Sequence, residues 1–239
     1  MNGLHISTPN DVLIVGYQFS GCEQVQEICE KLISTANQSM PPHMQSTVPQ
    51  AHLVINRLPD QCLTQTIKNN ALKVIYVVRN SQDVAVAKYL KAGFERTVPF
   101  STFLQGFVKD SSGFGGDWFR HTTQWSAVFS HIVSAQRHIV EYNSLKQNIE
   151  EEVCRLREFL GLKVSRDTMT SVCGQLVSES DQPSRKRQKT TDHDGDRDSA
   201  AQPGIWKEYF TVQLQEDFHA LFHQLLKDVT VFDPRRLLS

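Results

Sequence analysis

The chain has 239 residues, with 25 Lys and Arg against 26 Asp and Glu, so its formal net charge is -1. This balance argues against a dedicated nucleic-acid or membrane-surface binder. A chain of this length buries a sizeable core without disulfides or metals, and we expect a single domain over residues 1–239.

The cysteines and the N-terminal residues indicate the cellular compartment of the protein. The five cysteines are odd in number and lack the CxxC or Cys/His spacing of a metal site, which predicts free thiols and no bound metal. The first residues lack the basic residues and the apolar run of a signal peptide, and no apolar run is long enough to span a membrane. We therefore expect a cytoplasmic protein without membrane contact.

Three short apolar runs predict strands, at residues 12–15, 74–78 and 138–142. The first two are nearly continuous and β-branched, as in the centre of a parallel sheet that is covered on both faces. Each run is followed by a polar turn and then by apolar residues at helical spacing. This order predicts an α/β fold with three layers, in which helices flank a central parallel sheet.

The rest of the chain has a coarser pattern. Residues 100–135 are aromatic and predicted to be mostly helical, with a Gly-rich break at 113–116. Residues 178–202 are almost entirely polar, which predicts a disordered loop within the domain, because such a stretch buries too little apolar surface to offset its ordering entropy. A packed C-terminal helix is expected over 206–226.

The turn after the first predicted strand has the spacing of a phosphate-binding loop. Residues 16–23 read GYQFSGCE, which keeps the G-x-x-x-x-G frame between a strand and a helix, where backbone N–H groups converge on a phosphate. The Lys and Ser/Thr that follow the second Gly in nucleotide triphosphatases are Cys22 and Glu23 here. A nucleoside kinase or another P-loop phosphotransferase is therefore disfavoured, and a plain tight turn is the alternative.

The second predicted unit carries a more specific signal. Residues 73–86 read KVIYVVRNSQDVAV, which closely resembles the pattern K-V-x-Y-V-x-R-N-P-K-D-V-A-V-S of the cytosolic sulfotransferases. Further segments match that family in its own order. These are 116–125 (G-S-W-F-x-H…W in the family), 142–145 (Y-E-D-M), 157–161 (A-x-F-L-G), 204–207 (G-D-W-K) and 207–216 (the dimer motif K-x-x-x-T-V-x-x-x-E).

The resemblance implies a P-loop-like fold and a sulfotransferase that moves sulfonate from 3'-phosphoadenosine 5'-phosphosulfate (PAPS) to a hydroxyl or amine of a small molecule. His52 falls where the family has T-H-L-P-x-x-L-L-P, which makes it the expected catalytic base; a surface or core histidine is the alternative. The nucleotide-binding residues implied are Ser20, Gly21, Arg79, Tyr142, Trp206 and Lys207. The homodimer contact implied uses Lys207, Thr211, Val212 and Glu216.

The chain also departs from the family pattern Y-P-K-S-G-T-T-W in its first loop. The lysine of that loop is Phe19, its hydroxyl residues are Cys22 and Glu23, and its tryptophan is Gln24. Three further departures are Gln50 for a lysine, Ala87 for the serine of the 3'-phosphate site, and 199–201 (Ser-Ala-Ala) for R-K-G. Since a hydrogen bond from a charged group to an anion is worth about 1.5–3 kcal/mol, these losses weaken PAPS binding unless other residues substitute. A catalytically dead, dimeric binding or scaffold module with the same fold is the alternative function.

The polar stretch contains a basic run, RKRQK at residues 185–189. It is an ordinary solvated charge run, a set of cations that folds onto the 3'-phosphate, or a nuclear-localisation signal. The sequence leaves these alternatives open, and it does not identify the acceptor.

Overall fold

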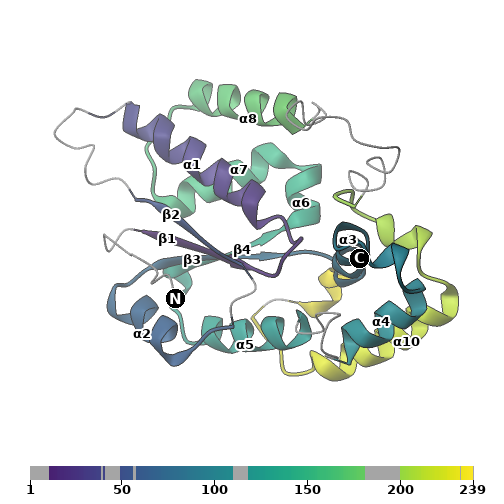
Figure 1. Ribbon diagram of the computed structural model, residues 1–239. Helices are drawn as coiled ribbons and strands as arrows, with labels where there is room; N and C mark the ends of the chain where they lie inside the picture. Colours follow the sequence, from purple (N-terminus) through teal and green to yellow (C-terminus); the bar gives the residue numbers. More distant parts are fainter. Residues whose placement is uncertain are drawn as a thin grey trace.

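A parallel sheet of four strands lies at the centre of the described part of the molecule (Figure 1). The computed structural model describes residues 11–38, 40, 49–55, 58–109, 118–180, 200–231 and 233–238. The strand order is β2-β1-β3-β4. The strands are β1 (Val12–Gly16), β2 (Ala51–Ile55), β3 (Lys73–Val78) and β4 (Arg137–Glu141).

The predicted strands are confirmed with small shifts. β1 and β3 are buried along almost their whole length, as nearly continuous apolar runs in a covered parallel sheet should be. The third predicted strand ends one residue earlier than expected, because Tyr142 begins the next helix. β2 was not predicted: it is an edge strand, mostly half-buried, with only three large apolar residues in a row.

Helices cover both faces of the sheet. Their bounds are α1 (Cys22–Gln38), α2 (Gln61–Asn69), α3 (Ser81–Lys91), α4 (Phe100–Val108), α5 (Trp118–Ser130), α6 (Tyr142–Gln147), α7 (Ile149–Leu160), α8 (Arg166–Ser180) and α10 (Val212–Leu225), with short 3-10 turns η2 (Phe94–Arg96), η3 (Ser134–Gln136), η4 (Ile205–Glu208) and η5 (Pro234–Leu237). The structure thus confirms the predicted class, a mixed α/β fold with a central parallel sheet flanked by helices.

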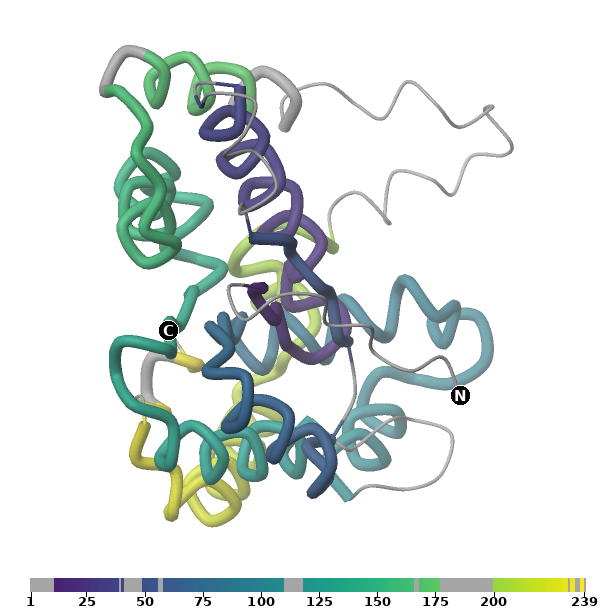
Figure 2. Tube along the Cα trace, turned by 90° about the vertical axis from the view of Figure 1, so that its left-hand side faces the viewer, coloured from purple at the N-terminus to yellow at the C-terminus, as the bar shows by residue number. Residues whose placement is uncertain are grey.

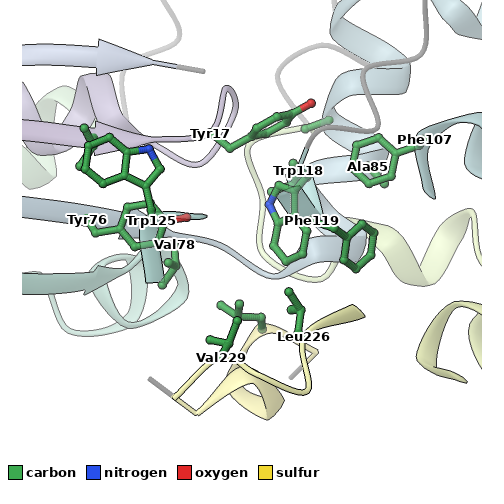
Figure 3. Packing of buried hydrophobic residues seen from close by; sticks show 14 of the residues in the cluster. Tyr17, Tyr76, Val78, Ala85, Phe107, Trp118, Phe119, Trp125, Leu226 and Val229 are labelled. Atoms are coloured by element: carbon green, nitrogen blue, oxygen red, sulfur yellow. The ribbon is translucent and has the colours of Figure 1, made fainter. Parts of the chain in front are cut away.

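Two hydrophobic clusters separate the two faces. Alternate residues of β1 point to opposite sides: Val12 and Ile14 pack with α1, α7 and α8, whereas Leu13 and Val15 pack with α2, α3, α4, α5 and α10. Figure 2 shows this separation from the side, with α1, α7 and α8 on one side of the sheet and α2, α5 and α10 on the other. The second cluster is rich in aromatic side chains, among them Tyr17, Tyr76 and Trp125 (Figure 3).

The strand order places the ends of β1 and β3 side by side. β1 pairs with β2 and with β3, and Gly16 lies opposite both Ile55 and Val77. The chain runs from β1 to β2 on one side and from β3 to β4 on the other, so β1 and β3 flank the point where the connections diverge. In open α/β sheets, ligands bind in the crevice at this point, outside the carboxyl ends of the strands.

The C-terminal part of the chain differs in detail from the expectation. The predicted helix over 206–226 begins as the 3-10 turn η4, and a regular helix starts at Val212. The predicted loop at 178–202 is described only at its ends, because α8 continues to Ser180 and the described chain resumes at Ala200. Residues 181–199, with the basic run, lie outside the described residues, as does the Gly-rich break at 113–116.

Two further findings bear on the sequence expectations. All five cysteines are free thiols. Within the described ranges, no helix combines the length and the apolar character that crossing a bilayer requires.

Candidate functional site

The loop between β1 and α1 makes a tight turn whose shape depends on two residues with positive φ. Gly21 has φ +91° and Phe19 has φ 65°, which is uncommon for a residue other than glycine. A Cβ placed on Gly21 would lie 2.2 Å from the Tyr142 ring. Gly21 is therefore required both for its backbone conformation and for the close approach of Tyr142.

Arg79 follows β3 and holds two distant segments against this loop. Its Nη1 donates to the carbonyl oxygen of Phe19 (3.0 Å), and its Nη2 donates to those of Ala200 (3.0 Å) and Gln202 (3.2 Å). The guanidinium carbon lies 4.7 Å from the centroid of the Tyr142 ring. Arg79 is 3% exposed, and its Nε has no hydrogen-bond partner in the part of the chain that the structure describes.

Asp83 fixes the segment that follows residue 200. It lies in the first turn of α3, where Asn80 caps the helix by accepting from the amides of Gln82 and Asp83. The carboxylate of Asp83 accepts from the amides of Gly204 (2.9 Å) and Trp206 (3.1 Å). Burial raises its pKa, while these two hydrogen bonds and the charges of Arg79 and Lys207 oppose the rise. The 204–207 segment is thus tied to the start of α3.

Burial also shifts the pKa values of the two groups that stack beside the loop. Burial lowers the pKa of Arg79, opposed by Asp83 and Tyr142, and burial raises the pKa of Tyr142, opposed by Arg79. The phenol of Tyr142 donates to the carbonyl oxygen of Ala201 (3.0 Å). Because a guanidinium is not deprotonated in proteins, Arg79 is a buried, fixed cation at this site.

A cavity of about 320 Å³ lies at the carboxyl ends of β3 and β4. Four of the six predicted nucleotide-binding residues line it, namely Arg79, Tyr142, Trp206 and Lys207. Ser20 and Gly21 do not, although Gly21 lies close to the Tyr142 ring. The structure therefore brings together residues that are 128 positions apart in the sequence, from Arg79 to Lys207.

Cys22, at the first of the family's two hydroxyl positions after Gly21, points into the core. Cys22 is fully buried, and its Sγ faces the carbonyl oxygen of Tyr17 (3.9 Å) and the Cα of Gly16, where an added Cβ would lie 2.3 Å away. Burial raises the pKa of the Cys22 thiol well above its ordinary value. The thiol is therefore neutral and packed into the core, and it offers nothing to a ligand in the loop.

His52 lies away from this site. It sits on β2 opposite Leu13 of β1, three residues before the strand ends at Ile55, which at ~3.3 Å per residue is about 10 Å from the carboxyl edge. Its Nε2 pairs with Oδ2 of the buried Asp11 (3.0 Å), which precedes β1. The structure thus places His52 near the amino end of β2, paired with Asp11, and not in the cavity that Arg79 lines.

A signal in the sequence indicates another residue at the family's histidine position. In the pattern T-H-L-P, Leu-Pro comes directly after the histidine, and in this chain Leu58-Pro59 comes directly after Arg57, just beyond the end of β2. Arg57 itself lies outside the described residues. The retained Leu-Pro pair is the feature that locates this position, and an arginine stays protonated at all physiological pH values.

The described residues contain no group of three or more His, Cys, Asp or Glu side chains that is arranged to hold a metal ion. The cationic groups that line the cavity are the buried guanidinium of Arg79 and the ammonium of Lys207.

A glycine-dependent loop after β1 and a buried arginine after β3, at adjacent strand ends, define an α/β protein of the P-loop-like class. A comparison with protein families gives the family: residues 9–230 match the family described as "Sulfotransferase domain". The chain belongs to the sulfotransferase family, as its sequence motifs predicted.

Individual relatives agree with this assignment. Sulfotransferase 1E1 of Bos taurus is 26% identical over 255 residues, covering 93% of this chain and 85% of the relative. Sulfotransferase 4A1 of Homo sapiens is 25% identical over 241 residues, covering 90% of this chain and 80% of the relative. Both similarities extend over nearly the whole chain.

The solved structure of mouse sulfotransferase SULT7A1, complexed with PAP, has a TM-score of 0.71 to this chain at 21% identity. The match covers 97% of this chain and 89% of that one. Retinol dehydratase in complex with androsterone and the inactive cofactor PAP gives a TM-score of 0.65 at 17% identity, over 95% of this chain and 84% of that one. At such identities these similarities establish the fold.

Proposed function

We propose that this chain is a sulfotransferase that binds PAPS at the carboxyl edge of its sheet and transfers sulfonate to a hydroxyl or amine of a small-molecule acceptor. The observation that carries the proposal is the buried guanidinium of Arg79 at the cavity between β3 and β4, with one donor atom unpartnered among the described residues. Membership of the sulfotransferase family and the PAP-bound structural neighbours support the same donor.

The residues at the nucleotide end fit such a ligand. The cavity volume of about 320 Å³ is at the lower end of the range of small-molecule sites. Arg79 and Lys207 supply cations for the 3'-phosphate, and Trp206 and Tyr142 supply aromatic surface beside them. Asp83 holds the segment that carries Trp206 and Lys207, so its role is to position them.

The residues at the sulfonate end fit less well. PAPS supplies an activated sulfonate when bound, and the chain's task is to stabilise negative charge there and to accept a proton. Phe19 provides no charge, Cys22 is buried, and His52 lies three residues before the carboxyl end of β2, about 10 Å from this edge at ~3.3 Å per residue. The amides of the loop and the N-terminus of α1 remain as donors at this end.

These gaps favour a second candidate, a nucleotide-binding member of the family that does not transfer sulfonate. The specific observation is the absence of a cationic side chain at Phe19 together with Arg57 in place of the family's histidine. Both candidates require the nucleotide, and they differ only in turnover.

Calorimetric titration with PAP at low salt tests what the two candidates share. We expect micromolar binding, weakened about tenfold in Lys207→Met, because an ammonium-to-phosphate contact is worth roughly 1.5 kcal/mol. Lys227→Met, at an exposed lysine beyond α10, is the matched control and should bind as the unaltered protein does. No binding by the folded protein at millimolar PAP would exclude both candidates.

Transfer of radiolabelled sulfonate from PAPS to a panel of phenols, alcohols and amines then separates them. Turnover with any acceptor supports the enzyme. PAP binding without turnover across the panel supports the nucleotide-binding candidate.

We also propose that the chain forms a homodimer through Lys207, Thr211, Val212 and Glu216. Thr211 caps α10 by accepting from the amide of Leu214 (3.3 Å), and Val212 beside it is 74% exposed. An apolar side chain so exposed at a helix start is available to a second copy across a two-fold axis. Light scattering should show that Val212→Glu converts the dimer to a monomer. Gln213→Glu, at the next exposed position, is the control, and an unchanged mass of Val212→Glu would contradict the proposed contact.

The cytoplasmic location stays a prediction.

A further inference from the structure

Two lysines of α3 approach aromatic residues of the β1–α1 loop. The Nζ of Lys88 donates to the phenol oxygen of Tyr17 (2.9 Å) and lies 5.3 Å from that ring's centroid. The Nζ of Lys91 lies 5.9 Å from the centroid of the Phe19 ring. Residues three apart on a helix share one face, so both ammonium groups leave α3 on the side of the loop.

The two lysines differ in their exposure to solvent. Lys88 is 8% exposed, whereas Lys91, the last residue of α3, is exposed. Lysine is among the residues least often buried, because desolvation of an ammonium is costly. A buried ammonium raises the electrostatic potential of the adjacent loop more strongly than an ammonium in water does, because the effective dielectric constant is lower there.

The loop is held between these cations and Arg79. The carbonyl oxygen of Phe19 accepts from Arg79, while the Phe19 ring lies near Lys91. Tyr17, the residue after β1, has its hydroxyl turned away from Tyr76 and Trp125 (Figure 3), and this hydroxyl accepts a hydrogen bond from Lys88. The positive φ of Phe19 thus directs its backbone to one cation and its ring to another.

We propose that Lys88 and Lys91 supply, from α3, the positive charge that Phe19 does not provide at the 5'-phosphosulfate end of the nucleotide. Lys91 is the group that reaches the anion. Lys88 adds its charge to the potential at the loop without touching the anion, and its hydrogen bond to Tyr17 positions the loop. The inference rests on the proposed nucleotide site, and it assigns to two residues of a neighbouring helix the task that one loop residue would otherwise have.

A comparison of two ligands isolates the contribution of the 5'-phosphate to binding. PAP carries both a 3'- and a 5'-phosphate, whereas adenosine 3'-monophosphate carries only the former. We expect Lys91→Met to weaken PAP binding roughly three- to tenfold and to leave binding of adenosine 3'-monophosphate unchanged. Lys68→Met is the matched control, since Lys68 is likewise exposed and in the last turn of its helix, α2; it should change neither ligand.

The buried lysine is tested by restoration of charge. Lys88→Met should weaken PAP about tenfold and adenosine 3'-monophosphate by much less, and Lys88→Arg should restore most of the loss because it keeps the cation. A purely structural role would move both ligands equally and would also lower the unfolding midpoint in urea. Where Lys88→Met does not fold, the Lys91 comparison decides.

The outcomes distinguish a failure of the proposed role of the α3 lysines from a failure of the proposed nucleotide site. PAP binding by the unaltered protein that is insensitive to Lys91→Met, or equal losses for the two ligands, would overturn the role of the α3 lysines and leave the nucleotide site intact. Failure of the unaltered protein to bind PAP would overturn both.

Discussion

The two sides of the crevice at the carboxyl edge differ in the charge of their side chains. On the β3 side, Arg79 and Asp83 are buried and make five hydrogen bonds to backbone groups of distant segments. On the β1 side, the corresponding loop has an aromatic ring at Phe19 and a neutral, buried thiol at Cys22.

The difference shows that the charged side is also structural. Each contact of Arg79 joins elements that are separated by 60 to 123 residues, so its loss would release the loop and the 200–206 segment together. The loop side depends on backbone conformation and packing, and its side chains can change without opening the fold. A family member can therefore lose the charges of its loop and still keep its arginine.

The largest expected effect is that of Arg79→Ala on stability. The substitution leaves the carbonyl oxygens of Phe19, Ala200 and Gln202 without their donor, and we expect the free energy of unfolding to fall by roughly 4 kcal/mol. Urea denaturation followed by circular dichroism measures it. A loss below about 1 kcal/mol would show that the guanidinium is held for ligand binding alone.

The next largest expected effect is a loss of folding stability at acid pH, caused by His121. His121 is fully buried next to Tyr17 (ring centroids 5.8 Å apart), and burial lowers its pKa to about 4. Because the folded-state pKa lies below the unfolded value of 6.5, the unfolded chain binds the proton first as the pH falls. Stability from this group is complete above about pH 6.5, and about 3 kcal/mol is lost by pH 4.

Comparison with His121→Gln isolates this group from the carboxylates that titrate in the same range. The variant should lose less stability between pH 7 and pH 4.5 than the unaltered protein. Parallel pH profiles for the two proteins would contradict the buried, neutral state of His121.

Gly21→Ala tests the packing of the loop against the β4 side. The positive φ and the contact of an added Cβ with the Tyr142 ring, at 2.2 Å, should together cost about 2 kcal/mol of unfolding free energy. The cost should be smaller on a Tyr142→Ala background, because the two residues are in contact. Additive effects of the two substitutions in thermal unfolding would show that backbone conformation alone decides the cost; Gly93→Ala, at a positive-φ glycine with open space, is the control.

The smallest expected effect is a gain in affinity from Phe19→Lys. On the Lys91→Met background we expect PAP to bind about tenfold tighter, since one new charged contact is worth roughly 1.5 kcal/mol. In the protein with Lys91 intact the gain should be smaller, because the two ammonium groups would serve the same anion. Calorimetry measures both gains. An equal gain on the two backgrounds would show that a lysine at position 19 and Lys91 do not serve the same anion.

Local sequence patterns determined the class of fold. The apolar runs of β1, β3 and β4 and the helical spacing after each are short-range features, and burial on both faces of a parallel sheet requires such runs. The order of motifs likewise identified the family and the position of Arg79. β2 was missed because an edge strand that is half-buried does not need a continuous apolar run.

Tertiary structure alone decided which side chains meet. His52 carried a plausible motif, yet the register of β2 with β1 places it at the amino half of the strand, against Asp11. The approach of Lys88 to Tyr17, 71 residues apart, and of Arg79 to Ala200, 121 residues apart, has no local signal. Strand order and helix orientation bring these groups together. A local sequence pattern specifies neither of them, because both depend on how distant segments pack.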